Sequence, residues 1–314
     1  MDASGVKNSQ NVSRHLPVMQ EELAIWLLHG KANCICDGTV GYGGHAETLL
    51  SRMGPESILV GIDRDAQALA ASKERLARFG KRALLIKGLF GDMKHLLQTV
   101  GLSEVDGVLL DLGVSSPQLD DPARGFSFQA EGPLDMRMDQ SMGQSAAELV
   151  NSLPESDLAD LIYQYGEERY SRRIARAIVR ARDSRSLQTT QDLVAVISES
   201  VPSSYRHGRI HCATRTFQAL RIAVNREIES LGPALRQAVD VVRPGGRIGV
   251  ISFHSLEDRI VKHTFRDLAQ APDARLTVLT KKPQIPTEEE CRSNPRARSA
   301  KLRVAERLPK ELVQ

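Results

Sequence analysis

Residues 35–45 read Ile-Cys-Asp-Gly-Thr-Val-Gly-Tyr-Gly-Gly-His, and this stretch decides the fold. An apolar run at residues 32–36 leads into it, and a helical pattern at residues 46–50 follows. The sequence therefore predicts a strand, a tight loop and a helix. Glycines can adopt positive φ angles and bring bare backbone against a ligand, while a helix N-terminus offers unpaired N–H groups. We expect the loop to bind a ligand rather than merely to turn the chain.

Three kinds of ligand could bind to a glycine loop of this type. A phosphate-binding P-loop requires Gly-Lys-Ser/Thr, whereas Gly44 is followed by His45, which excludes it. A dinucleotide fingerprint fits loosely from Gly41 onward, and Asp63 follows at about the expected 20-residue distance to bind a ribose. Asp37, however, would repel a pyrophosphate and attract the ammonium and sulfonium groups of S-adenosylmethionine. That cofactor is therefore favoured, and a nicotinamide-dependent dehydrogenase is the second interpretation.

The composition indicates a globular protein without a membrane segment. The 314 residues are 41% hydrophobic and 26% charged, which is ordinary for a globular chain. No stretch approaches 18 uncharged apolar residues, and residues 1–13 lack an apolar signal core, so we expect a cytoplasmic protein. Four cysteines form no C-x-x-C pair, and no metal site is predicted.

The net charge of +3 is mild, but its distribution is uneven. Residues 131–160 hold seven acids and one arginine, whereas residues 166–215 hold ten basic residues and five acids. Residues 281–310 hold nine basic residues and four acids. Two separate basic segments in a nearly neutral chain indicate a localised surface for a polyanion.

The alternation of apolar runs and helical patterns predicts an α/β fold. Strands are expected at residues 58–62, 83–86, 105–110 and 248–252, and several of them end in an acid or glycine. Such a pattern is typical of a doubly wound parallel sheet with its ligand at the carboxyl ends of the strands. The alternation stops in between, so residues 1–122 and 213–314 are predicted to form the sheet domain and residues 123–212 an inserted all-helical domain.

Seven motifs in the expected order closely resemble the RsmH family, also called MraW. These enzymes are bacterial and methylate the exocyclic N4 of one cytosine in the decoding region of 16S ribosomal RNA. The similarity runs from about His15 to Arg307. The motifs are Asp-Gly-Thr-x-Gly-x-Gly-Gly-His (37–45), Asp-Leu-Gly-Val-Ser-Ser-Pro-Gln-Leu-Asp (111–120), Arg-Gly-Phe-Ser-Phe (124–128), Pro-Leu-Asp-Met-Arg-Met (133–138), Ala-Thr-Arg-Thr-Phe-Gln-Ala-Leu-Arg-Ile (213–222), Ser-Phe-His-Ser-Leu-Glu-Asp-Arg (252–259) and Asn-Pro-Arg-Ala-Arg-Ser (294–299).

The resemblance implies a class I (Rossmann-like) methyltransferase sheet, an insert that helps to recognise rRNA, and S-adenosylmethionine as cofactor. It implies 16S rRNA as the partner, and the two separate basic segments favour a large folded substrate, the rRNA within the small ribosomal subunit. The cofactor contacts that it implies are Gly43, Gly44, His45, Asp63, Phe90, Asp111 and Gln118.

The chemistry requires little of the protein beyond positioning. Cytosine N4 is a poor nucleophile, so the amine must be held in line with the methyl group while an acceptor draws on its protons. Asp111, Ser115, Ser116 and Pro117 are the residues expected to do this. The residues expected to bind RNA are Arg172, Arg173, Arg176, Arg296 and Arg298. For the basic helix the alternative is a solvated face, and for the whole protein it is a ribosome-assembly factor that binds rRNA without catalysis.

Overall fold

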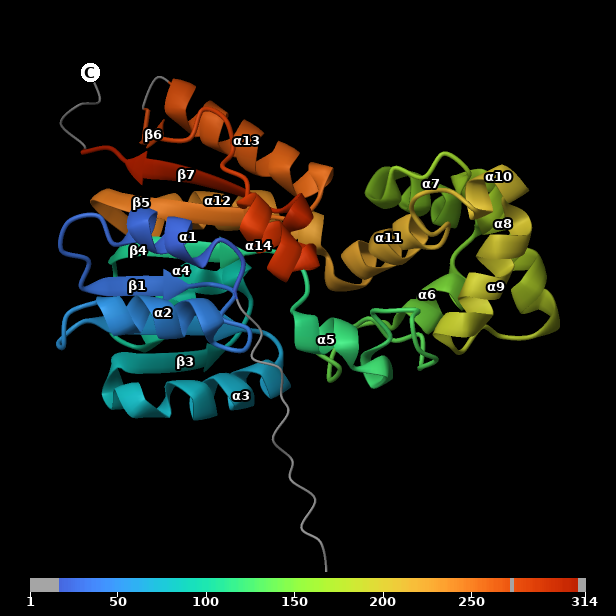
Figure 1. The fold of residues 1–314 in the computed structure, drawn as a ribbon, viewed down its shortest axis with the longest axis horizontal. Helices are drawn as coiled ribbons and strands as arrows, with labels where there is room; N and C mark the ends of the chain where they lie inside the picture. The colour runs from blue at the N-terminus through green and yellow to red at the C-terminus, as the bar shows by residue number, and fades with distance from the viewer. Residues whose placement is uncertain (1–16, 272–273, 310–314) are drawn as a thin grey trace, which may run out of the picture.

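The computed structural model describes residues 17–271 and 274–309, which form an α/β layer and a helical layer side by side (Figure 1). One seven-stranded sheet runs in the order β3-β2-β1-β4-β5-β7-β6. The strands are β1 (Cys34–Asp37), β2 (Ile58–Asp63), β3 (Ala83–Lys87), β4 (Val105–Asp111), β5 (Val242–Ser252), β6 (Leu276–Val278) and β7 (Lys301–Arg307).

The first five strands of this order are parallel, and β7 runs antiparallel to both β5 and β6. The apolar runs in β1 and β4 are buried because helices cover both faces of the sheet. This arrangement confirms the predicted α/β fold of the class I methyltransferases. Parallel strands also bring their carboxyl ends to one edge, where β1, β2 and β4 end in Asp37, Asp63 and Asp111.

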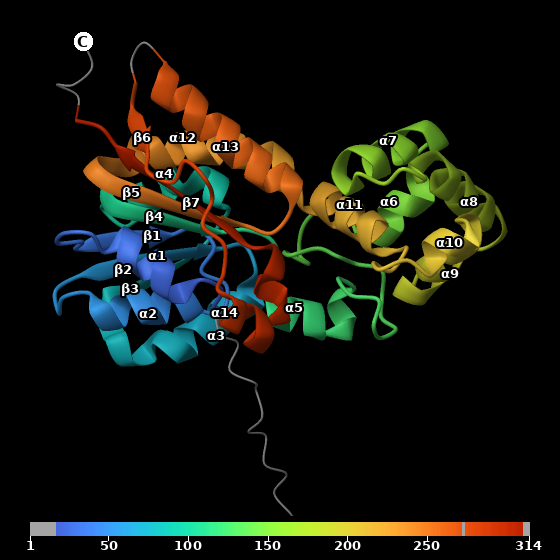
Figure 2. The ribbon, with the colours of Figure 1, turned by 45° about the horizontal axis from the view of Figure 1, so that its top comes forward.

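Two separate cores show which helices cover which face. Residues of α4 (Met93–Thr99), α12 (Glu227–Val241) and α13 (Ser255–Gln270) pack in one core with the inner strands. Residues of α1 (Gln20–Leu27) and α2 (Gly44–Arg52), with Leu76 of α3 (Ala66–Leu76), pack in the other. Figure 2 shows these helices on their two sides of the sheet. No helix of the described ranges is long and apolar enough to cross a membrane.

The helical layer has a core of its own, built from apolar residues such as Leu158, Ile162, Ile178 and Phe217. Its helices are α6 (Ala146–Ser152), α7 (Glu155–Gly166), α8 (Ser171–Ser184), α9 (Thr190–Ser200), α10 (Ser203–Arg206) and α11 (Thr214–Asn225).

Helix α11 packs against α7 in the helical layer, although the sequence boundary assigns it to the sheet domain. We therefore propose that the insert spans residues 123–225 rather than 123–212. The outermost parts of the two expected sheet-domain segments, residues 1–16 and 310–314, lie outside the described residues.

Three local expectations were wrong. The sequence predicts one helix from 214 to 231, but Arg226 adopts a left-handed conformation (φ 52°) and separates α11 from α12. Residues 152–155, Ser-Leu-Pro-Glu, predict a capping box, but α7 begins after Pro154 without a side-chain cap. Ser255 is expected to cap the helix at residues 256–268, but the N-cap of α13 is His254.

Candidate active site

The glycine loop is held by the strand ends around it. Gly38 N donates to the Leu109 carbonyl at 2.9 Å, and Gly41 N donates to Asp63 Oδ2 at 2.8 Å. Gly43 has φ 78° and begins α2, and a Cβ there would lie 3.1 Å from Ser72 Oγ. The loop therefore needs glycine at this position for its backbone conformation and for close packing on α3.

A cavity of about 610 Å³ opens between this loop and the start of α12, which is a suitable size for a small-molecule ligand. Gly43 and Asp37 do not line it. Ten of the residues predicted from the sequence do line it, namely Gly44, His45, Asp63, Phe90, Asp111, Ser115, Ser116, Pro117, Gln118 and Arg296.

Asp63 accepts two backbone hydrogen bonds at the end of β2. Gly41 N donates to one carboxylate oxygen and Asp65 N to the other, each at 2.8 Å. Burial raises the pKa of Asp63 to about 6, while these hydrogen bonds act in the opposite direction. Each oxygen keeps a second lone pair, so Asp63 can shape the loop and still accept a ligand hydroxyl.

His45 and Asp111 both line the cavity, and their side chains lie close to each other. His45 Nε2 lies 3.3 Å from Asp111 Oδ2, and Thr39 Oγ1 accepts the Asp111 backbone N–H at 2.6 Å. The other carboxylate oxygen, Asp111 Oδ1, is buried and accepts no hydrogen bond from the described residues. Because a buried carboxylate oxygen normally has a donor, this atom fits a ligand N–H or O–H group.

Asp37 does not play the role expected from the sequence. Its side chain is 1% exposed, lies outside the cavity lining and accepts the Thr39 N–H at 3.1 Å. Burial raises the pKa of Asp37 to about 7, and the nearby His45 partly offsets that rise. The prediction that Asp37 faces the ligand was therefore wrong. Asp37 instead stabilises the loop by accepting the backbone N–H of Thr39.

A buried network connects the loop after β4 to α3, and its only signal in the sequence is an arginine inside a motif. Asp65 caps α3 and accepts Gln118 Nε2 at 2.7 Å and Arg124 Nη1 at 2.8 Å. Arg124 also donates to the carbonyls of Arg137 and Met138. Gln118 therefore positions α5 (Ser116–Asp120) in this structure, and its cofactor contact stays a prediction.

The arginines predicted to bind RNA are all on the surface but differ in their partners. Arg172 and Arg173 are exposed on α8, and Arg176 lies 3.3 Å from Glu155. In the tail, Arg296 pairs with Asp120, whereas Arg298 is exposed without an ion pair among the described residues.

The basic surplus of the tail is partly used inside the protein. Lys301 and Arg303 both pair with Asp258. Among the described residues, the insert therefore has more basic side chains without an ion pair than the tail has.

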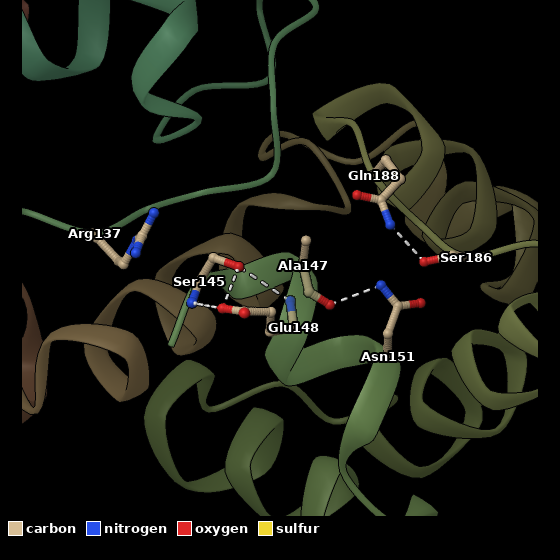
Figure 3. Close-up of a pocket in the computed structure, with 7 residues that line it drawn as sticks. All are labelled: Arg137, Ser145, Ala147, Glu148, Asn151, Ser186 and Gln188. Carbon is tan, nitrogen blue, oxygen red and sulfur yellow. Dashed lines mark hydrogen bonds between the residues drawn. The ribbon is translucent and has the colours of Figure 1, made fainter. Parts of the chain in front are cut away.

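A second hollow of about 390 Å³ lies on the helical layer (Figure 3). Its polar groups bind one another: Ser145 and Glu148 form a capping box, and Asn151 Nδ2 donates to the Ala147 carbonyl at 2.7 Å. Arg137 is held by Asp135. Satisfied groups of this kind offer little to a ligand, so the cavity at the sheet edge is the candidate site.

Comparison with known proteins shows which family this chain belongs to. The model of the MraW methylase family matches residues 12–308. The chain belongs to the MraW methylase family. It is 51% identical over 309 residues to the ribosomal RNA small subunit methyltransferase H of Pelobacter propionicus, covering 94% of this chain and 99% of that protein. The corresponding protein of Synechococcus elongatus is 52% identical over 294 residues, covering 94% and 95%.

A solved rRNA methylase from Streptococcus thermophilus shares 11% identity with a TM-score of 0.43, covering 92% of this chain and 94% of that one. That structural likeness is too weak to carry an argument. Family membership confirms the resemblance found in the motifs and the cofactor, S-adenosylmethionine, and it removes the dehydrogenase interpretation. The cavity fits this cofactor, because it combines carboxylates for the ribose and the positive groups with the apolar Phe90.

Proposed function

We propose that this MraW-family methylase methylates the exocyclic N4 of a cytosine in the decoding region of 16S rRNA. The observation that carries the proposal is Asp111 Oδ1, a buried acceptor that receives no hydrogen bond within residues 17–271 and 274–309, on a residue that lines the cavity at the end of β4. The relatives' name, ribosomal RNA small subunit methyltransferase H, supports the substrate class.

The cofactor site uses groups that line the cavity. Asp63 would accept the ribose hydroxyls, the N-terminus of α2 at Gly44 would face the carboxylate of the amino-acid part, and Phe90 would lie against the adenine ring. When bound, S-adenosylmethionine supplies an electrophilic methyl group on its sulfonium.

The protein's own contribution to the transfer is positioning. Cytosine N4 is weakly nucleophilic because its lone pair is delocalised into the ring. Asp111 Oδ1 would accept an N–H of that amine, hold the remaining lone pair toward the methyl group and receive the proton that N4 releases as the new N–C bond replaces the S–C bond. Ser115, Ser116 and Pro117 line the same wall and would limit how the base can enter. The base must leave its stack to arrive there.

RNA binding is assigned to the arginines at positions 172, 173 and 176 of α8 and to Arg296 and Arg298. The three α8 arginines are exposed on the outer helical layer, where a phosphate backbone can reach them. Packing of the described residues does not require them, since the buried side of α8 is formed by Ile174, Ala175 and Ile178.

Mass spectrometry of nucleosides from 16S rRNA tests the proposal. We expect N4-methylcytidine in rRNA from cells with the protein and its loss when the gene is deleted or replaced by an Asp111→Asn variant. Methylation at cytosine C5 or at a ribose hydroxyl would contradict the reaction. If the Asp111→Asn variant, shown to be folded, methylated normally, Asp111 would have no positioning role. The same modification with and without the gene would leave the non-catalytic assembly factor as the explanation.

A further inference from the structure

A polar network of residues outside the predicted cofactor contacts lines the same cavity. The left-handed conformation of Arg226 separates α11 from α12 and changes the direction of the chain. Glu227, the first residue of α12, therefore lies close to α11. Arg221 Nε donates to Glu227 Oε1 at 3.0 Å and Arg221 Nη2 to Oε2 at 2.9 Å. Both side chains are mostly buried, at 17% and 11% exposure, so this bidentate pair is a fixed part of the wall.

A second carboxylate joins the pair from the start of α13. Glu257 is 2% exposed and accepts Phe253 N at 2.8 Å. One ligand atom each of Glu227, Glu257 and His254 lies within 4.8 Å of the others. Burial raises the pKa of Glu257, but the neighbouring His254 and the charge of Arg221 bring it below its ordinary value. Glu257 also accepts the His254 backbone N–H at 3.3 Å, and its other oxygen lies 3.1 Å from His254 Nε2. Each oxygen of Glu227 keeps a second lone pair beyond its bond from Arg221.

The sheet places this network beside the reacting edge. Strands β4 and β5 are neighbours with Asp111 opposite Ile251, and Leu112 N donates to the Ile251 carbonyl at 2.9 Å. The residues that follow β5 therefore lie next to the loop that follows Asp111. Arg221, Glu227, Glu257 and Phe253 all line the same cavity as Asp111.

We propose that Arg221, Glu227 and Glu257 form the site that recognises the Watson–Crick edge of the target base. Cytosine presents the N4 amine as a donor beside the acceptors N3 and O2. Arg221 keeps N–H groups beyond the two that bind Glu227, and these can donate to N3 or O2. The carboxylates can accept from N4, and the ring of Phe253 offers an apolar surface for the base. This inference rests on the proposed function, because it assumes that a flipped base enters the cavity.

The carboxylate oxygens that face the amine set the specificity. Uracil carries a carbonyl in place of the amine, and its O4 would face a carboxylate without a proton between them. A divalent cation is the other ligand that such a cluster could take. Arg221 argues against it, because a guanidinium already engages both oxygens of Glu227.

The test compares Glu227→Gln and Arg221→Lys with two controls that make the same chemical changes elsewhere. Glu74→Gln on α3 and Arg236→Lys on α12 alter exposed side chains that form no hydrogen bond or ion pair within the described part of the chain. Cytidine and uridine are the probes, measured by NMR at millimolar concentration on full-length protein with S-adenosylhomocysteine. Calorimetry of S-adenosylmethionine binding shows whether each variant keeps its cofactor site.

We expect the wild type and both controls to bind cytidine about ten- to a hundredfold more tightly than uridine, the effect of one well-placed charged hydrogen bond. Glu227→Gln and Arg221→Lys should lose that preference and keep their cofactor affinity. Equal affinity for both nucleosides in the wild type, including no binding of either, would overturn the proposal. An unchanged preference in both variants would do so too, as would Mg²⁺ or Mn²⁺ binding that depends on Glu227.

The outcome is separable from that of the proposed function. Nucleoside discrimination with no N4-methylcytidine in cells would retain the base site and reject the reaction. N4-methylcytidine in cells with no effect of the two variants on discrimination would retain the reaction and reject the base site.

Discussion

Asp63 combines a structural and a binding role in one carboxylate. It holds Gly41 through a 2.8 Å hydrogen bond and lines the cavity, so its loss should affect the loop and the cofactor together. We expect Asp63→Ala to weaken S-adenosylmethionine binding by about ten- to a hundredfold, because a charge-assisted hydrogen bond contributes about 1.5–3 kcal/mol. Calorimetry measures this, with Glu56→Ala, an exposed acid, as control. Unchanged affinity in a folded Asp63→Ala protein would remove Asp63 from the cofactor site.

Asp37 should make the stability of the protein depend on pH. Its pKa is about 7 in the folded protein and about 3.8 when unfolded, so the folded state binds the extra proton between these values. The free energy of unfolding should therefore fall as pH rises from about 4 to 7, by up to about 1.4 kcal/mol per pH unit from this group. Urea unfolding of the wild type and Asp37→Asn across pH 5 to 8 measures the difference. Parallel curves for the two proteins would show that Asp37 is ionised throughout.

At the scale of elements, the pair Arg124–Asp65 joins the beginning of the insert to α3. The side chains are 3% and 4% exposed, and removing Arg124 would leave a buried carboxylate without its cation. We expect Arg124→Ala to lower the free energy of unfolding by about 3–5 kcal/mol. Denaturant unfolding checks the value, and the double variant Arg124→Ala/Asp65→Asn should recover part of the loss. A loss below about 1 kcal/mol would show that the pair contributes little.

Helix α8 should give the RNA complex much of its salt dependence. Replacing Arg172, Arg173 and Arg176 by glutamine should make the affinity for RNA less sensitive to salt. The slope of log affinity against log salt concentration should become shallower by up to about 0.7–0.9 per lost phosphate contact. Filter binding of 16S rRNA at several salt concentrations gives the slope. The matched control replaces Arg236, Lys262 and Arg266, three exposed bases on α12 and α13. Equal slopes for the two triple variants would favour the solvated-face interpretation of α8.

At the scale of the whole molecule, residues of the α/β layer and of α11 line one cavity, and basic side chains are exposed on the insert and on the tail. One flipped base does not need so extended a surface, so we expect a large folded substrate. With labelled cofactor, the protein should methylate small ribosomal subunits efficiently. It should methylate naked rRNA or a short hairpin poorly. Equal labelling of the three would contradict this expectation.

Much of the α/β layer could be predicted because its signals are local. Apolar runs predict β1, β2 and β4 to within a residue or two, and the glycines at 41–44 mark the loop between β1 and α2. Parallel strands share an edge for their carboxyl ends, so the placement of Asp63 and Asp111 at one edge followed from the predicted parallel sheet. The seven motifs added the family, which the comparisons confirm.

What the sequence could not determine depends on contacts between distant residues and on rare backbone conformations. The break between α11 and α12 is an arginine, Arg226, in the left-handed conformation, which no residue pattern predicts, and Glu227 directly after it pairs with Arg221. Burial of Asp37 beneath the loop and the bond from Gln118 to Asp65 likewise arise only when separate segments pack. The sequence by itself therefore determined the strands, the glycine loop and the family. Tertiary packing decided which polar groups face the cavity, because burial and long-range hydrogen bonds exist only in the folded chain.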